Sequence, residues 1–276
     1  SRFLLPSTVC SENLQTLWSY IMRNHKRVAT RLGDMFIFTD DPSIGKSLDL
    51  YGEYCYSEIE LILNMVNLDS IVLDVGANIG SHCLALAPHV KNVVAFEADK
   101  ENVELLRMNC SLRSDVTIKH LALGDRIGRT STKFNFGKTE LDAGKSDVDM
   151  TTLDALKFPK VDFIKIDVEG MELDVLEGGR DLITQLKPNM LIEMQDSFMN
   201  PSVFNFLNDL EYKIWWYPVA TFNAGNYKNN QNNVFGKQHG VINWFASQHP
   251  HTVTQELMPV VDEFDTIERA EHTRRS

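Results

Sequence analysis

Strand-like and helix-like segments alternate along this chain from residue 71 onward, and this alternation restricts the fold more than any other feature. Apolar runs are expected to form strands at 71–75, 92–98, 116–123, 161–167 and 188–195, and helical patterns lie at 80–90, 99–112, 171–186 and 200–210. The short runs do not alternate polar and apolar residues, which is typical of strands buried on both faces of a parallel sheet. We therefore predict an α/β fold with a mostly parallel sheet and helices on both faces.

The last two strands of the pattern, 212–219 and 241–248, have no helical pattern between them, so one of them is expected to run antiparallel. Before the alternation begins, the sequence predicts a helix over 11–24, a β-hairpin over 27–40 and a helix over 57–66 with Ser57 as its N-cap. We predict an N-terminal extension over 1–50, a main domain over 51–250 and a tail over 251–276.

The composition is that of a globular protein, with 43% hydrophobic and 24% charged residues among 276. The net charge of -11 argues against nucleic acid as a partner, because phosphate binding needs a basic surface. No apolar run is long enough for a membrane span and no signal-peptide pattern is present, so we expect no membrane association and a cytoplasmic location. The four cysteines, Cys10, Cys55, Cys83 and Cys110, lack metal-binding spacing and are expected to be buried thiols.

The segment "GANIG" follows the strand at 71–75 directly and leads into a helix. Gly76 and Gly80 allow a tight turn and a close approach of a ligand to the backbone, as in the ligand loop of Rossmann-like folds. The loop lacks both GxGxxG and GK[ST]. Asp74, at the end of the strand, would repel a pyrophosphate but attract an ammonium or a sulfonium. The loop therefore favours a cationic ligand over a dinucleotide.

A second acid ends the next strand of the pattern. Glu97 lies about 20 residues after the glycine loop, where an acid accepts hydrogen bonds from ribose hydroxyls. Together with the loop it indicates S-adenosylmethionine as the cofactor, with its cationic part at the loop, its ribose at Glu97 and its adenine against the following strand.

Five motifs in this order resemble the FkbM-type methyltransferases over about residues 30–247: "YGEYCYSEIELILNMV", "VLDVGANIGSHCLALA", "VVAFEADKENVELLRMN", "HLALGD" and "VDFIKIDVEGMELDVLEGG". The element "IKIDVEG" is the most specific of them, and Met171 departs from the more usual Ala. The resemblance implies a seven-stranded sheet with an antiparallel last strand, S-adenosylmethionine as cofactor, and O-methylation of a hydroxyl.

The resemblance also assigns residues to the cofactor. By position, Asp74, Gly76, Asn78 and Gly80 correspond to the cofactor loop of the family. Glu97 corresponds to its ribose acid, and Ala122 falls where backbone groups meet the adenine. The remaining residues expected at the same site are Ala77, Ala98 and Asp167.

Asp167 and Glu193 each end a strand at the carboxyl edge of the sheet, where ligands bind in open α/β folds. Either acid can serve as a base on an acceptor hydroxyl, the two can hold a divalent cation, or Asp167 and Glu169 can simply cap the following helix. No third metal ligand is evident, so we predict no metal site. Asp174 and Glu177 are expected to face water.

His239 is a third candidate base, because it lies just before the last strand on the side expected to border the acceptor. The polar segment 221–240 is too long for a hairpin loop, so we interpret it as a lid over the acceptor. The predicted function is O-methylation of a small molecule or sugar. The alternatives are an NAD-dependent oxidoreductase and a non-catalytic Rossmann-like binding module. The sequence indicates no oligomeric state.

Overall fold

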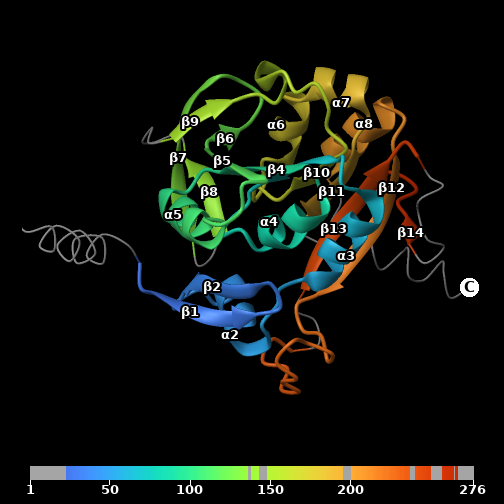
Figure 1. Cartoon of the computed structure of the whole chain (residues 1–276). Coiled ribbons are helices and arrows are strands. Elements are labelled where there is room, and N and C mark those ends of the chain that lie inside the picture. Colours follow the sequence, from blue (N-terminus) through green and yellow to red (C-terminus); the bar gives the residue numbers. More distant parts are fainter. Residues whose placement is uncertain are drawn as a thin grey trace, which may run out of the picture.

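The computed structural model describes residues 23–135, 138–142, 148–194, 200–236, 240–249, 257–263 and 265–266. Within these ranges an eight-stranded sheet has the order β14-β12-β13-β11-β10-β3-β4-β5 (Figure 1). Its strands are β3 (Ile71–Val75), β4 (Asn92–Glu97), β5 (Val116–His120), β10 (Phe163–Ile166), β11 (Asn189–Met194), β12 (Lys213–Ala220), β13 (Gly240–Ser247) and β14 (Met258–Pro259). The helix predicted over 11–24 and most of the predicted tail lie outside the described residues.

The strands β3, β4, β5, β10 and β11 are parallel, so their C-terminal ends meet at one edge of the sheet. As predicted for the last pair, β13 runs antiparallel to both of its neighbours, β11 and β12. The expectation of seven strands is wrong by one. The additional strand, β14, is only two residues long and pairs with Trp215 and Trp216 of β12.

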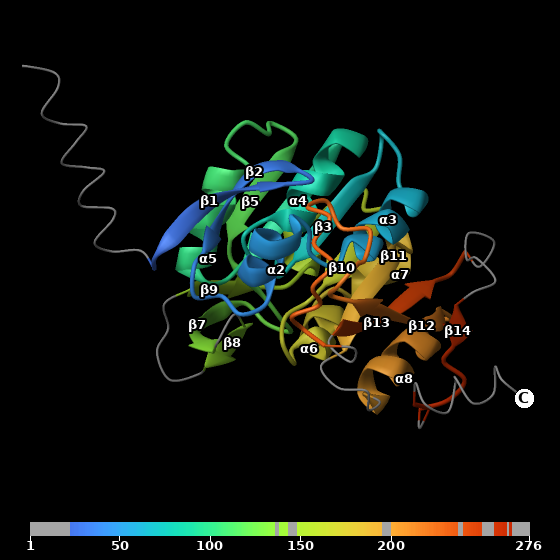
Figure 2. The same ribbon diagram turned by 90° about the horizontal axis from the view of Figure 1, so that it is seen from below.

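Helices cover both faces of the sheet, as predicted (Figures 1 and 2). One face carries α3 (Tyr56–Met65), α4 (Ser81–Leu86) and α5 (Lys100–Asn109), and the other carries α6 (Glu172–Glu177), α7 (Arg180–Leu186) and α8 (Pro201–Asp209). Successive residues of β3 supply the two cores: Val72 packs on the α3 side, and Leu73 packs on the α6 side. Burial on both faces explains why the parallel strands are continuous apolar runs.

Two helix predictions need correction. The helix predicted over 171–186 is divided into α6 and α7, because the chain at Gly178 approaches another segment closely: a Cβ there would lie 1.9 Å from the carbonyl oxygen of Gly124. The helix predicted over 57–66 begins at Tyr56, and its N-cap is Cys55 with a φ of 42°, so the assignment of Ser57 as cap is wrong.

A second sheet of four strands, which the sequence did not predict, follows β5. The run predicted as one strand over 116–123 is divided, and its end forms β6 (Ala122–Leu123), which pairs with β9 (Val148–Thr151). The strands β7 (Gly128–Asn135) and β8 (Lys138–Asp142) complete the order β6-β9-β7-β8. The division turns the chain at Gly124 towards Gly178.

The predicted hairpin is present as β1 (His25–Thr30) and β2 (Gly33–Phe38), and an unpredicted helix, α2 (Ile44–Tyr51), follows it. Both elements pack near the glycine loop through an apolar cluster that includes Met35, Ile37, Leu48 and Ile79. The side-chain amide of Asn109 accepts a hydrogen bond from the Phe36 N–H (2.7 Å) and donates to the carbonyls of Phe36 (3.0 Å) and Ile79 (2.8 Å). Asn109 therefore fastens the hairpin to the loop.

Candidate functional site

The glycine loop connects β3 to α4 in a backbone conformation that explains its composition. Gly76, Asn78 and Gly80 have φ values of 84°, 50° and 90°. A Cβ at Gly76 would lie 1.8 Å from the carbonyl oxygen of Asp167, so only glycine fits there. The N–H groups of Gly76 and Ala77 both donate to the carbonyl of Phe96 at 2.9 Å. The loop is thus held between the C-terminal ends of β4 and β10.

Glu97 places its carboxylate beside this loop. One oxygen accepts a hydrogen bond from the Asn78 N–H and the other from the Asp99 N–H, each at 2.8 Å. Burial raises the pKa of Glu97 to about 7, although these two backbone hydrogen bonds act in the opposite direction. The Asn102 side chain also hydrogen-bonds to this carboxylate, and the lone pairs that remain can accept from a ribose. The geometry fits that role, which stays a prediction.

Ala122, predicted near the adenine, and Ala98, predicted at the cofactor site, lie beside Glu97. Ala98 packs against a small core that contains Ala122, Val148 and Met150. The His120 ring contacts the carbonyl oxygen of Ala98 through Nε2 at 3.1 Å, as expected for a histidine used within the fold. Ala98 follows β4 of the main sheet and Ala122 lies in β6 of the second sheet, and their contact with a cofactor stays a prediction.

Asp167 and Glu193 meet at the C-terminal edge of β10 and β11, where their carboxyl groups hydrogen-bond. Burial alone would raise the pKa of Asp167, but Lys165, whose Nζ donates to Oδ2 at 2.9 Å, holds that pKa below its usual value. Burial and the Asp167 charge raise the pKa of Glu193 well above its usual range. The two carboxyl groups therefore titrate as a coupled pair, in which Asp167 loses its proton more readily than Glu193.

Lys165 lies beneath this pair with only 4% of its side chain exposed, whereas the Asp167 side chain is 26% exposed. Its buried ammonium stays charged because four surrounding carboxylates raise its pKa against the effect of burial. We call these acids the carboxylate cluster; they are Glu58, Asp74, Asp167 and Glu193. Four acids around one lysine give this edge of the site an excess of negative charge.

Glu58 extends the carboxylate cluster into the helix layer. Its carboxylate contacts His82 Nε2 at 3.0 Å and accepts a hydrogen bond from the Asn243 amide at 3.0 Å. Sequence reasoning missed Glu58, Asn243 and Lys165 as site residues. A signal existed for Lys165, since a lysine in the buried strand "FIKI" needs a partner of opposite charge.

Asp74 is 1% exposed and lies under the glycine loop. One carboxylate oxygen accepts from the Cys83 thiol at 3.1 Å, and the other has no hydrogen-bond partner within the described part of the chain. Asp74 is also the register neighbour of Lys165. Direct contact of Asp74 with a ligand stays a prediction.

The other acids of "IKIDVEGMELDVLEGG" divide by position. Glu169 has a φ of 52° in the turn before α6. Glu172 accepts a hydrogen bond from the Gly170 N–H at 2.9 Å at the start of the helix. Glu177 is exposed as predicted and pairs with Arg180. Asp174 is half-buried, so the expectation that it faces water is not met.

The described part of the predicted lid, 221–236, is fastened to α2. The Tyr51 hydroxyl donates to the carbonyl of Asn232 (2.9 Å) and accepts from the Val234 N–H (3.0 Å). The rings of Phe222 and Phe235 contact the Tyr51 ring at centroid distances of 5.3 and 5.9 Å. These aromatic residues anchor the segment to α2, while a lid role stays a prediction. His239 lies outside the described residues.

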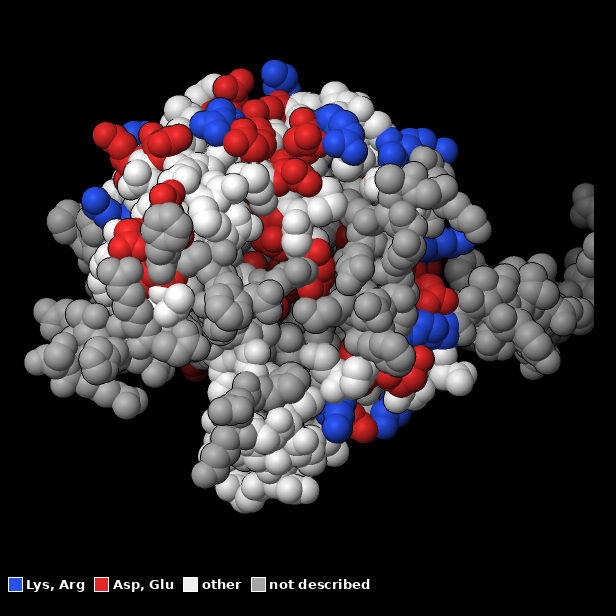
Figure 3. Space-filling view, turned by 180° about the vertical axis from the view of Figure 1, so that it is seen from behind, with Lys and Arg blue, Asp and Glu red and all other residues white. Residues whose placement is uncertain are grey.

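The surface seen from behind carries Asp and Glu side chains in a central hollow, with Lys and Arg side chains around its margin (Figure 3). Within the described ranges, no group of three or more His, Cys, Asp and Glu side chains is arranged to hold a metal ion. No helix in those same ranges combines the length and apolarity that a membrane crossing requires. Cys55, Cys83 and Cys110 are buried and free, as predicted.

The strand order, with an antiparallel β13 between β11 and β12, and the glycine loop at the end of β3 together define a Rossmann-like methyltransferase fold. The profile of the methyltransferase FkbM domain matches residues 74–214, and the chain belongs to this family. The resemblance seen in the sequence motifs is thereby confirmed.

One similar protein is the hexuronic acid methyltransferase AglP of Haloferax volcanii, which is 32% identical over 143 residues. The match covers 47% of this chain and 57% of that relative. A methyltransferase FkbM from Methylobacillus flagellatus has a similar solved structure, with a TM-score of 0.45 and 20% identity over 65% of this chain and 44% of that chain. A Geobacter metallireducens precorrin-6y methyltransferase has a TM-score of 0.44 and 14% identity over 68% and 85% of the two chains.

Proposed function

We propose that this protein is an S-adenosylmethionine-dependent methyltransferase that methylates a hydroxyl group of a small molecule or sugar. The observation that carries the proposal is the carboxylate cluster beside the glycine loop, with four acids around Lys165. This excess of negative charge favours a cationic sulfonium and disfavours the pyrophosphate of NAD. The similarity to a hexuronic acid methyltransferase supports a sugar as the acceptor.

The residues around the loop fit this cofactor. Segment 76–80 would hold its amino-acid part, Glu97 its ribose hydroxyls, and the backbone at Ala98 and Ala122 its adenine. The lone pairs of the Glu97 carboxylate that the Asn78, Asp99 and Asn102 hydrogen bonds leave unused would accept from the ribose. When bound, S-adenosylmethionine would supply an electrophilic methyl group on sulfur.

The acceptor hydroxyl loses a proton as its oxygen forms the new C–O bond, and the site must take up that proton. We assign this task to Glu193, because its raised pKa makes it a stronger base than Asp167 once it is ionised. Asp167, held ionised by Lys165, hydrogen-bonds to Glu193 and orients it. The value of kcat/KM should therefore rise with pH as Glu193 loses its proton, at a pH above the usual range for Glu.

Calorimetric titration tests the cofactor. S-adenosylmethionine and its demethylated product should both bind, whereas NAD should not. Glu97→Ala should weaken binding of both sulfur ligands by about 1–3 kcal/mol, because two ribose hydrogen bonds to a charged group are lost. Tight NAD binding with no response to either sulfur ligand would overturn the proposal.

Isotopically labelled methyl transfer tests the base. Glu193→Gln should lower turnover by about 100-fold or more, the usual contribution of a general base, and should remove the acidic limb of the pH profile. Cofactor affinity should change little. Glu177→Gln is the matched control, since Glu177 is an exposed acid paired with Arg180. An unchanged acidic limb in Glu193→Gln would assign the proton to another group.

A further inference from the structure

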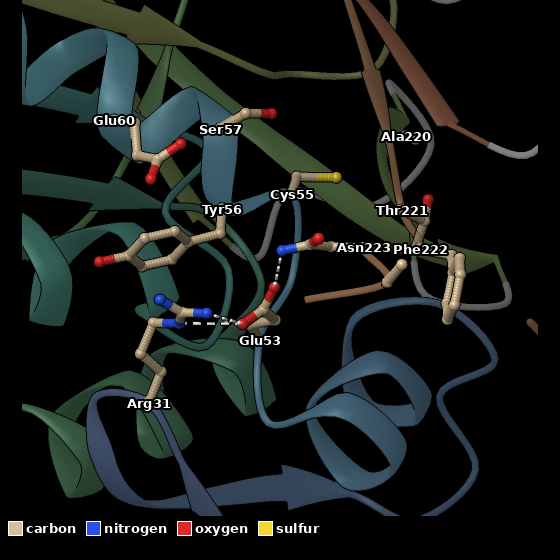
Figure 4. Close-up of a pocket in the computed structure, with 11 residues that line it drawn as sticks. Arg31, Glu53, Cys55, Tyr56, Ser57, Glu60, Ala220, Thr221, Phe222 and Asn223 are labelled. Atoms are coloured by element: carbon tan, nitrogen blue, oxygen red, sulfur yellow. Dashed lines mark hydrogen bonds and ion pairs between the residues drawn. The ribbon is translucent and has the colours of Figure 1, made fainter. Parts of the chain in front are cut away.

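A cavity of about 450 Å³ opens between the hairpin turn at Arg31, segment 53–60 and segment 220–224 (Figure 4). This volume lies within the range of small-molecule binding sites. The three segments come from both ends of the described chain, and none of the residues that line the cavity is used in the cofactor assignment. The cavity is therefore a candidate binding site to which no ligand has yet been assigned.

Glu53 organises the wall of this cavity. Its carboxylate accepts hydrogen bonds from Nε of Arg31 (2.9 Å), from the Asn223 amide (2.9 Å) and from the Tyr227 N–H (3.0 Å), and it forms an ion pair with Nη2 of Arg31 (2.7 Å). Glu53 itself is only 5% exposed. A buried acid with four donors fixes the orientation of Arg31 and Asn223 before any ligand arrives, which lowers the entropy lost on binding.

The groups that remain available suit a hydroxylated ring. The contacts of Arg31 with Glu53 use Nε and Nη2, so the Nη1 donors are available to the cavity. The guanidinium lies over the Tyr56 ring at 4.3 Å, which holds its plane. Glu60 adds an exposed acceptor, and Phe222 adds an aromatic surface. Planar polar groups match adjacent hydroxyls, and an aromatic ring matches the C–H face of a sugar.

The charge of the lining narrows the class of ligand. Two carboxylates, Glu53 and Glu60, accompany one guanidinium, that of Arg31. This balance disfavours a polyanion such as a nucleotide diphosphate, whereas it accepts a neutral or singly charged saccharide.

The cavity borders the carboxylate pair through segment 54–58. Cys55 and Tyr56 line the cavity, while Glu58 points into the carboxylate cluster. Glu58 and Glu193 are close enough to Cys55 to add to the effect of burial on the pKa of its thiol, and Glu193 acts on Tyr54 in the same way. A ligand in the cavity would thus contact segment 54–58, whose other side adjoins Glu193, the proposed base.

We infer that this cavity is the acceptor subsite of the proposed methyltransferase, and that it binds a neutral or singly charged saccharide ring through Arg31 and Asn223. The inference rests on the proposed function for its role as an acceptor site, while the binding of a saccharide can be measured without turnover.

Saturation-transfer NMR tests the binding directly, with methyl glucoside, methyl glucuronoside, catechol and uridine diphosphate as probes. The two glycosides should receive saturation from the protein, and catechol and the nucleotide should not. Ala224→Trp, which places an indole at an exposed position of the lining, should abolish the glycoside signal. Asn223→Ala and Arg31→Lys should each weaken glycoside binding about tenfold.

Arg27→Ala and Asn232→Ala are the matched controls. Arg27 is an arginine of the same hairpin that pairs with Asp34 at the surface, and Asn232 is an exposed residue of the same insertion. Both should bind the glycosides as the unmodified protein does. Equal glycoside signals in Ala224→Trp and the unmodified protein would overturn the inference, as would saturation of catechol alone.

Titration of S-adenosylmethionine into the same samples separates the two proposals. If the cofactor fails to bind the unmodified protein while the glycosides bind and Ala224→Trp blocks them, the proposed function fails and the saccharide site stands. If the cofactor binds all variants equally and no glycoside binds, the saccharide site is wrong and the cofactor assignment stands.

Discussion

Lys165 is the residue whose positive charge stabilises the buried carboxylates around it. Its ammonium is surrounded by acids from β3, α3, β11 and the end of β10, and it is almost fully buried. A buried acid without a cation would be neutralised by a proton. Lys165 therefore keeps Asp167 ionised at the edge where the proposed chemistry takes place.

Lys165→Met should lower the free energy of unfolding by about 3–5 kcal/mol, because it leaves buried acids without their cation. Urea denaturation at neutral pH measures this loss. Lys26→Met is the control, since the ion pair of Lys26 with Asp49 is exposed and should contribute about 1 kcal/mol or less. Equal losses in the two variants would show that Lys165 is not the cation on which the cluster depends.

Glu97 should make stability depend on pH in an unusual direction. Its pKa is raised from 4.5 to about 7 in the folded chain, so the folded state binds the proton more tightly than the unfolded state. The contribution of Glu97 to stability should therefore fall as pH rises from 4.5 to 7 and stay level above that, by up to about 3 kcal/mol. Urea unfolding without ligand across this range measures it. Glu97→Gln should lack this slope, and parallel curves would contradict the assignment.

The elements that sequence patterns could predict are those with a local signal. The parallel strands were predictable because burial on both faces makes each one a continuous apolar run. The strands β6 and β14 were not, because two residues carry no periodicity. The division between α6 and α7 was also hidden. Two glycines are tolerated in an isolated helix, and only the approach of Gly124 makes Gly178 necessary.

Gly178→Ala tests this contact between elements. Gly178 has a φ of -70°, so alanine causes no backbone strain, and only the 1.9 Å approach to the Gly124 carbonyl opposes it. Alanine should lower the free energy of unfolding by about 1–3 kcal/mol, the usual effect of overpacking. Gly128→Ala is the control, because a Cβ there meets nothing within 4 Å. Thermal or urea unfolding compares the two, and similar values would exclude the steric explanation.

The site residues also divide into those with a local sequence signal and those that only the folded structure reveals. The glycine loop and Glu97 were predictable because their relation is local in the sequence. The partners of Lys165 were not, because Glu58, Asp74 and Glu193 come from a helix and two strands that only the folded sheet brings together. For Asp167 and Glu193, the sequence predicted both their positions at strand ends and their proximity at one edge of the sheet.

The whole molecule is joined on its N-terminal side by Glu53, which links the hairpin to segment 221–236. Glu53→Ala removes the shared acceptor of these two segments and should loosen both. Amide hydrogen exchange in β1, β2 and 221–236 should become about tenfold faster or more, whereas exchange in α6, α7 and α8 should not change. Glu60→Ala, an exposed acid in the same cavity wall, should leave all of these rates unchanged. Uniform acceleration would mean that Glu53 stabilises the entire fold.

The position of β13 determines when the strands of the sheet can pair during synthesis on the ribosome. The strand β12 hydrogen-bonds only to β13 and β14 within the described sheet, and both are synthesised after it. The five parallel strands can assemble while β12, which contains Trp215 and Trp216, has no strand to pair with. Domains fold as they emerge, and unpaired apolar strands invite association with other chains. A nascent chain stalled before residue 240 would therefore carry the five parallel strands together with an unpaired β12 that is prone to association.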